Sequence, residues 1–203
     1  MIPALLLAEA LTAFCALAFE TATARLVAPY AGLSTDSWTA IIAGFLLSWA
    51  LGNHLGGACT AGSMRLSLFR AAAAMLAGTI AIALTPSLLP ALDAWIVAPD
   101  PLARWRMVVF AAVPTLMPGV LLGIAPPLLM LAIIERGGGR GALVGLANAA
   151  GAAGSAAGAL SVLWLGLDLL GARGTCIAIA ALGILAAAVT AAAGSVAASR
   201  RPA

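Results

Sequence analysis

Charged side chains are scarce in this sequence, and lysine is absent. Only 8% of the 203 residues are charged, whereas 64% are hydrophobic, and the mean hydropathy is +1.12. Soluble domains usually contain about 25% charged residues. A chain with so few charges cannot cover a water-facing surface, so the composition excludes an ordinary soluble domain and indicates a protein that lies mostly in lipid.

Basic clusters and catalytic sets are missing as well. The basic residues are all Arg, the net charge is only +3, and no clustered basic face of the kind that binds nucleic acid appears. The cysteines, Cys15, Cys59 and Cys176, have neither metal nor redox spacing. Catalytic Ser-His-Asp sets or paired carboxylates outside the membrane are also absent. We therefore expect no nucleic-acid partner, no metal, no cofactor and no enzymatic activity.

Unbroken apolar runs predict the fold class. Each membrane crossing needs roughly 20 apolar residues, and the period-two alternation of a membrane barrel does not occur. These observations predict an all-α integral membrane protein with about six transmembrane helices in a single polytopic domain over 1–203. The expected helices are approximately 2–27, 38–55, 66–84, 105–134, 142–165 and 175–196.

Proline and glycine punctuate this pattern. Pro29 and Gly32 are expected to end the first helix, and Gly56 and Gly57 to begin a loop after the second. We expect Pro86 to stop the third helix. Further along the chain, Leu88, Leu89, Leu92, Trp95 and Ile96 follow helical spacing, which predicts a short helix lying flat at the membrane interface between helices 3 and 4.

The predicted helix 105–134 is too long for one straight crossing. It contains Pro114, Pro118, Pro126 and Pro127, and each internal proline removes a backbone hydrogen bond. We therefore expect a kinked or broken helix whose freed carbonyls are satisfied by neighbouring helices.

The distribution of Arg predicts the orientation. With six crossings, one side of the membrane receives more Arg than the other, namely Arg65, Arg70, Arg136, Arg140, Arg200 and Arg201. The positive-inside rule then places both termini in the cytoplasm.

Two carboxylates in the first helix are candidate binding groups. Glu9 and Glu20 lie 11 residues apart, close to three helical turns, and therefore share a face. An ionisable residue within a membrane helix is expensive and is a functional candidate by default. Glu20 could bind a cation or exchange a proton, or it could fix packing through hydrogen bonds. Arg25 is the third candidate of this binding site, and its side chain could also extend to the lipid headgroups or form a salt bridge with another helix.

Other polar and small residues suggest packing. Asn53 and His54 close the second helix, where a hydrogen bond is favoured for His54, and Asn148 is expected to hydrogen-bond across helices. The helix 142–165 and its start carry small pairs four residues apart: Gly141 with Gly145, Gly151 with Ser155, and Gly154 with Gly158. Such pairs allow close helix approach, either within one subunit or at a dimer face.

These residues also carry a family resemblance. The matching residues and segments are Glu20, 24–34 with Pro29, Tyr30 and Gly32, then Trp38-Thr39, 50–53 with Asn53, Gly56-Gly57, 123–128 with Pro126 and Pro127, Asn148, Gly154, Gly158 and 170–175 with Arg173. This pattern resembles the membrane part of bacterial spermidine-synthase-like membrane proteins, in which a major-facilitator-like region precedes an aminopropyltransferase domain. The resemblance spans nearly the whole chain.

The resemblance implies half of a major-facilitator fold in the bacterial inner membrane. The Gly-rich, acid-containing nucleotide loop of the aminopropyltransferase has no counterpart here, so the resemblance implies the membrane module and not the polyamine-forming reaction. Two classes of function follow. The first is an interaction or anchoring module that serves a separately encoded membrane or cytoplasmic protein. The second is a small homodimeric transporter or sensor for polyamines or other small cations.

Overall fold

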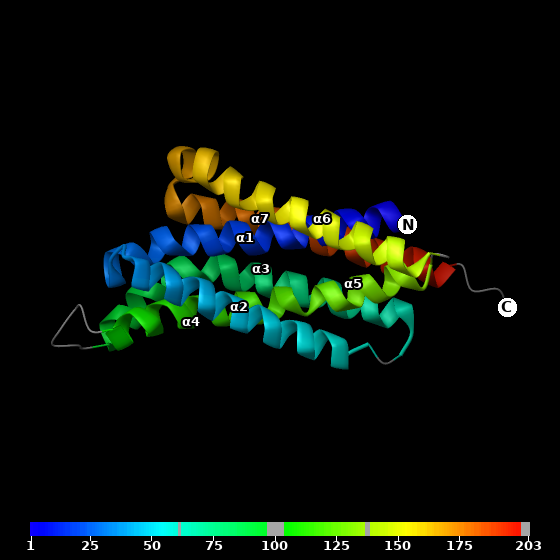
Figure 1. The fold of residues 1–203 in the computed structure, drawn as a ribbon, viewed down its shortest axis with the longest axis horizontal. Helices are drawn as coiled ribbons and strands as arrows, with labels where there is room; N and C mark the ends of the chain where they lie inside the picture. The colour runs from blue at the N-terminus through cyan, green and yellow to red at the C-terminus, as the bar shows by residue number, and fades with distance from the viewer. Residues whose placement is uncertain (61, 97–103, 137–138, 200–203) are drawn as a thin grey trace.

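The computed structural model describes residues 1–60, 62–96, 104–136 and 139–199, which form long helices running side by side (Figure 1). No strand occurs in these ranges, which confirms the all-α class. In chain order the elements are α1 (Ile2–Ala31), α2 (Thr35–Ala58), α3 (Met64–Trp95), α4 (Arg104–Gly123), α5 (Ala125–Ile134), α6 (Arg140–Ser161), the π-helix η1 (Val162–Gly166) and α7 (Leu167–Ser199).

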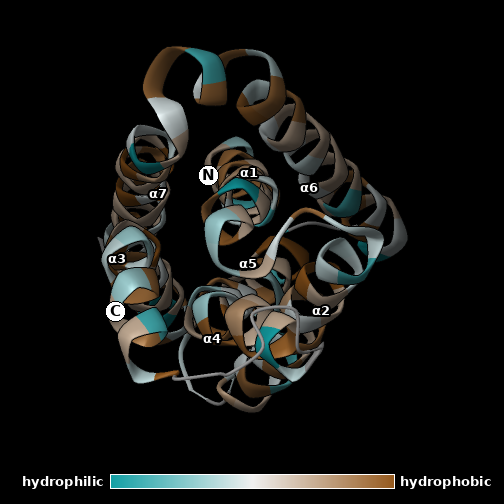
Figure 2. Ribbon diagram, turned by 90° about the vertical axis from the view of Figure 1, so that its left-hand side faces the viewer, coloured by the Kyte–Doolittle hydropathy of each residue, from teal (hydrophilic) through white to brown (hydrophobic). Residues whose placement is uncertain are grey.

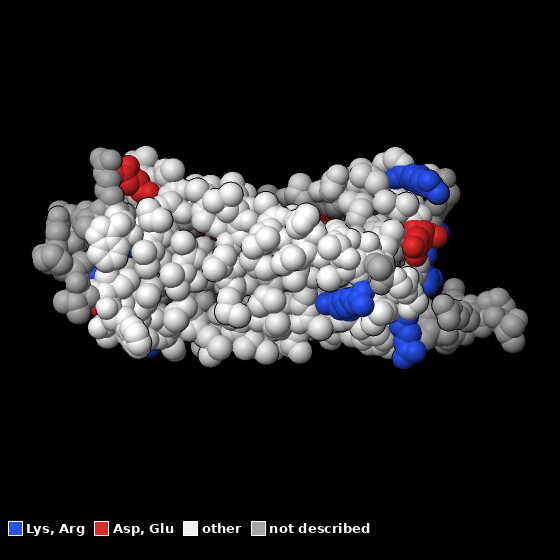
Figure 3. Space-filling model, turned by 90° about the horizontal axis from the view of Figure 1, so that it is seen from below, with Lys and Arg blue, Asp and Glu red and all other residues white. Residues whose placement is uncertain are grey.

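The helices are suited to a bilayer. Within the described ranges, five helical stretches are long and apolar enough to cross a membrane: Ile2–Ala31, Thr35–Ala58, Met64–Trp95, Trp105–Ile134 and Arg140–Val196. At 1.5 Å per residue the 30-residue α1 extends about 45 Å, more than the roughly 30 Å hydrocarbon core. On the face seen in Figure 3, charged side chains gather toward the two ends. The protein is a membrane helical bundle.

Helix α1 lies at the centre of the bundle, with α6 and α7 on opposite sides of it (Figure 2). Helix α2 packs mainly against α4, and α3 packs mainly against α7. The core has two parts. One surrounds Phe19, Phe45 and Phe110 toward the end of α1, and the other surrounds Leu5 and Leu128 near its beginning.

The predicted interfacial helix between helices 3 and 4 is wrong. Helix α3 continues through Pro86 and Pro90 to Trp95. Burial explains the continuation, because Leu89 is completely buried beyond the first proline and Leu92 packs against the same core cluster. The apolar spacing is therefore that of the last turns of a long helix. Pro86 and Pro90 each lack a backbone N–H, and the packed bundle tolerates the two missing donors.

Several helix ends also differ from the prediction. Helix α1 continues past Pro29 to Ala31 and is capped by Gly32, whose φ of 75° suits glycine. Helix α2 begins earlier because the Ser34 side chain accepts a hydrogen bond from Ser37 N at 3.1 Å and completes a capping box. At its other end α2 includes Gly56 and Gly57, which were predicted to form a loop.

The predicted helix 105–134 is divided at Ile124 into α4 and α5. The predicted helices 142–165 and 175–196 correspond to a helical stretch that contains the π-helix η1 and a non-helical residue, Gly171, with φ 65° and ψ 176°. Figure 1 shows α6 and α7 running in opposite directions on the two sides of this turn.

Candidate functional site

Glu9 and Glu20 of α1 define what we call the acid face. The regular helix places both side chains on the same side of the central element of the bundle. Glu20 is only 8% exposed. Glu9 is half-buried, and its Oε2 atom is buried without a hydrogen-bond partner in the described structure. Glu9 Oε2 has therefore lost its hydrogen bonds to water, and no described group forms a hydrogen bond in their place.

Helix α6 lies directly against this face. A Cβ atom added at Gly151 would lie 3.4 Å from Glu9 Oε1, and one at Gly154 would lie 2.9 Å from Ala10 Cα. A Cβ at Gly158 would similarly meet the backbone of Phe14, at 3.0 Å from its Cα. These three glycines thus bring the α6 backbone onto α1 within one chain. Ser155 is half-buried, and Gly141 and Gly145 face open space.

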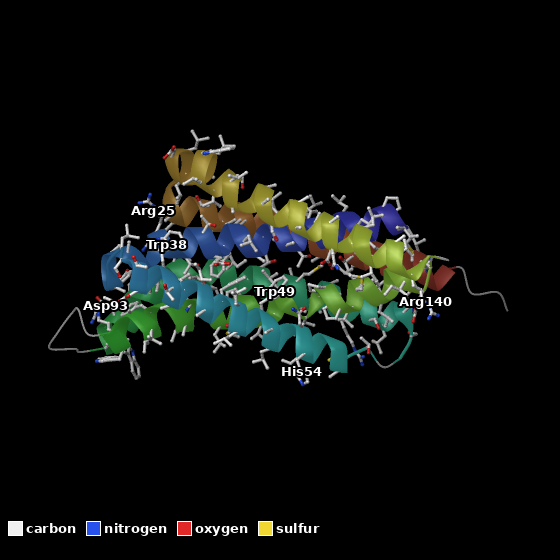
Figure 4. The ribbon with its side chains drawn as sticks, in the orientation of Figure 1. Arg25, Trp38, Trp49, His54, Asp93 and Arg140 are labelled. Carbon is white, nitrogen blue, oxygen red and sulfur yellow. The ribbon has the colours of Figure 1, made fainter. Side chains whose placement is uncertain are left out.

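No described basic side chain neutralises the acid face. Arg25 is exposed, and the ion pair found in the described part of the chain joins Arg106 to Asp93. Arg25 instead lines a cavity of about 490 Å³ together with Thr21 and Trp38. Figure 4 places Arg25, Trp38 and Asp93 at one end of the bundle, with His54 and Arg140 toward the other.

A second glycine-mediated contact, between α2 and the pair α4 and α5, was not predicted from the sequence. A Cβ at Gly52 would lie 2.9 Å from Gly123 Cα, one at Gly119 would lie 2.7 Å from Ser48 Cβ, and one at Gly56 would lie 2.6 Å from Pro127 Cγ. The four-residue spacing of Gly44, Ser48, Gly52 and Gly56, matched by Thr115, Gly119 and Gly123, is the signal that would have revealed this contact.

Asn53 bridges this second contact at the break between α4 and α5. With its amide oriented to satisfy both groups, Oδ1 accepts from Trp49 Nε1 at 3.0 Å and Nδ2 donates to Gly123 O at 3.0 Å. Gly123 O is the carbonyl that residue 127 would satisfy in a continuous helix, but Pro127 has no N–H. Asn53 therefore replaces the donor that Pro127 removes.

We expect Asn53→Leu to reduce the free energy of unfolding by about 1–3 kcal/mol, because it leaves Gly123 O buried without a donor. Pro127→Ala restores a backbone N–H, so the double variant Asn53→Leu/Pro127→Ala is expected to recover part of this loss. Thermal unfolding of the four proteins in detergent measures the coupling. Strictly additive effects would contradict the assignment.

A polar cluster centred on Arg106, which was not predicted from the sequence, connects the ends of α1, α3 and α4. Arg106 on α4 pairs with Asp93 on α3, donates to Tyr30 O at 3.2 Å and to Ile96 O at 3.3 Å, and lies over the Phe110 ring at 5.1 Å. The Tyr30 and Phe110 rings stack with centroids 5.2 Å apart. In the sequence Asp93 and Arg106 lie 13 residues apart, in segments that were predicted as two different helices, so their spacing does not indicate the pair.

The remaining candidate residues lie away from the acid face. His54 and Gly57 are exposed near the end of α2, and Pro126 and Pro127 begin α5. Asn148 is exposed on α6 and makes no hydrogen bond to a described residue, so the expected cross-helix bond is not formed there. Arg173 is exposed near the turn at Gly171 and, together with Arg25, lines a cavity of about 430 Å³.

Within the described ranges, no group of three His, Cys, Asp or Glu side chains could hold a metal ion. Comparison with protein-family models, with curated proteins and with solved structures found no match. The resemblance to the membrane part of spermidine-synthase-like proteins therefore stays a prediction, and the site must be interpreted from its own geometry.

Proposed function

We propose that this chain is a membrane protein that binds small cations or protons through Glu20 and Glu9. The observation that carries the proposal is the acid face itself, on which two carboxylates lie within a membrane helix and no described cation pairs with either. A carboxylate in this setting is costly, at about 2.5–3.5 kcal/mol on insertion scales, unless it faces water, a proton or a bound cation.

The arrangement of helices supports a six-crossing protein resembling half of a major-facilitator fold. If α4 and α5 count as one crossing, the six crossings form two consecutive three-helix units, α1–α2–α3 and α4/α5–α6–α7. The first helix of the first unit, α1, packs on the middle helix of the second unit, α6. The first crossing of the second unit, α4, likewise packs on the middle helix α2, and α3 packs on α7. Reciprocal packing of this kind is what two inverted three-helix repeats produce.

We further propose the bacterial inner membrane as its location, with both termini in the cytoplasm. Arg65, Arg70, Arg136 and Arg140 lie in or beside the connections α2–α3 and α5–α6, which join the helices on the side of the bundle where α1 begins. Together with Arg200 and Arg201, which follow α7 in the sequence, six of the ten arginines belong to this side, and such an excess favours the cytoplasmic side.

The separation of the two carboxylates suggests how a cation would use them. Eleven residues correspond to about 16 Å along the helix axis, so Glu9 and Glu20 cannot share one small ion. A linear polyamine can contact both, and a proton or small cation can visit them in turn. In either case α1 provides successive binding positions across the membrane, with a second copy completing the path.

The test is uptake of radiolabelled spermidine into proteoliposomes. We expect Glu20→Gln to lower the rate at least tenfold, because the amide keeps the shape of the side chain but removes the charge that attracts the cation. Asp168→Asn is the matched control, since it makes the same change at an exposed carboxylate in the first turn of α7. Equal uptake by the wild type and Glu20→Gln would refute the role of Glu20.

A second candidate function, an interaction module for a separately encoded protein, is favoured by the outer surface of α6. Gly145, Asn148, Ala149, Ala152 and Ala156 form an exposed stripe on this helix. Small residues with one amide suit a closely approaching partner helix. Native mass spectrometry of protein extracted gently from its own membrane distinguishes the two candidates: a stable hetero-complex supports the module, and a homodimer supports the transporter.

A further inference from the structure

We propose that the cavity between α1, α3 and the start of α7 binds the phosphate headgroup of an anionic phospholipid. This headgroup cavity has a volume of about 430 Å³, and its lining includes Arg25, Arg173, Leu26, Leu89 and Leu170. It is separate from the acid face, and the proposal does not depend on cation binding by Glu9 or Glu20.

The two arginines supply the positive charge. Both side chains are exposed, and neither forms an ion pair or a hydrogen bond with a described residue. Asp168, the acid nearest to Arg173 in the sequence, forms no ion pair with either of them. Two uncompensated guanidinium groups on one cavity suit a phosphate, because each can donate a fork of N–H groups to its oxygens.

The backbone at the turn is compatible with an anion. Gly171 has a non-helical φ of 65°, and the Thr175 side chain donates to Gly171 O at 2.7 Å. The residues that directly follow such a break have N–H groups without an intrahelical acceptor. These groups favour negative charge beside the guanidinium groups of Arg25 and Arg173.

The apolar lining identifies the ligand as a lipid and not a free phosphate. Leu26, Pro86, Leu89 and Leu170 contribute alkyl surface to the same cavity. A bound inorganic phosphate would leave this surface exposed to water, whereas the glycerol and first acyl carbons of a phospholipid would cover it. The cavity also lies at an end of the membrane helices, where lipid headgroups are found (Figure 4).

Native mass spectrometry of the purified full-length chain, titrated with phosphatidylglycerol or phosphatidylcholine, tests the proposal. We expect a preference for phosphatidylglycerol, and the variant Arg25→Gln/Arg173→Gln is expected to weaken its binding by about thirtyfold. The matched control is Arg65→Gln/Arg140→Gln, which removes the same net charge from exposed arginines of α3 and α6. This control is expected to retain wild-type binding.

A second variant protects the test against misfolding. Leu170 is 54% exposed, so Leu170→Glu should fold while placing a competing carboxylate beside both arginines. It should reproduce the loss of phosphatidylglycerol. Equal binding of the two lipids, unchanged binding by Arg25→Gln/Arg173→Gln, or displacement of the lipid by millimolar inorganic phosphate would each overturn the assignment. The last result would indicate a site for a soluble anion.

Discussion

Gly154→Leu is expected to prevent α6 from packing on α1. A Cβ atom at this position would lie 2.9 Å from Ala10 Cα, and because the obstacle is backbone, no side-chain rotation can relieve the clash. Overpacking in ordinary cores costs about 1–3 kcal/mol, and we expect a loss at or above the upper end of this range. Thermal unfolding in detergent, followed by size-exclusion chromatography, measures the loss.

Gly145→Leu is the matched control on the same helix. No atom lies within 4 Å of a Cβ built at Gly145, so the added side chain should enter lipid with little effect on unfolding. If Gly145→Leu destabilises the monomer as much as Gly154→Leu, the close contact between α1 and α6 is not the cause. If it instead abolishes a complex while leaving the fold intact, the outer stripe of α6 is a partner surface.

Arg106→Gln is expected to loosen the end of the bundle where α1, α3 and α4 meet. Asp93 is 42% exposed, so the ion pair itself contributes little. The larger loss comes from the Tyr30 and Ile96 carbonyl oxygens, which no longer accept the guanidinium hydrogen bonds, and from the cation–π contact with Phe110. Together these contacts correspond to about 2–3 kcal/mol of unfolding free energy.

Arg65→Gln serves as the control for this change. Arg65 also lies over an aromatic ring, with its guanidinium carbon 5.5 Å from the centroid of Phe69, but it forms no ion pair in the described part of the chain. We expect its removal to change stability by less than about 0.5 kcal/mol. Equal losses in Arg65→Gln and Arg106→Gln would show that the helix ends are held by other contacts.

The fold class could be predicted because it depends on composition and on the length of apolar runs. Those signals are local, and the helical membrane bundle follows from them. The shared face of Glu9 and Glu20 follows in the same way from the geometry of one helix. A kink or break within 105–134 could also be predicted from its four prolines, since proline acts on its own turn, but its place at Ile124 could not.

The features that were predicted wrongly or not at all depend on contacts between segments that are distant in the sequence. Pro86 is expected to end a helix, yet α3 continues past it because Leu89 is buried, and Leu92 partly buried, against other helices. The Asn53 bridge to Gly123 and the contacts of Arg106 with Tyr30 and Ile96 each join separate helices. Periodicity along one segment does not identify the polar partner that a distant segment supplies.

The central position of α1 has a consequence for biosynthesis. This helix is synthesised well before α6, which covers part of its acid face and begins only at Arg140. At about 5–20 residues per second, ribosomes need roughly 5–20 s to reach that point. During this interval Glu9 lacks the cover that α6 later provides at Gly151. We therefore expect α1 to be retained by the insertion machinery, or held beside α2 to α5, until α6 has emerged.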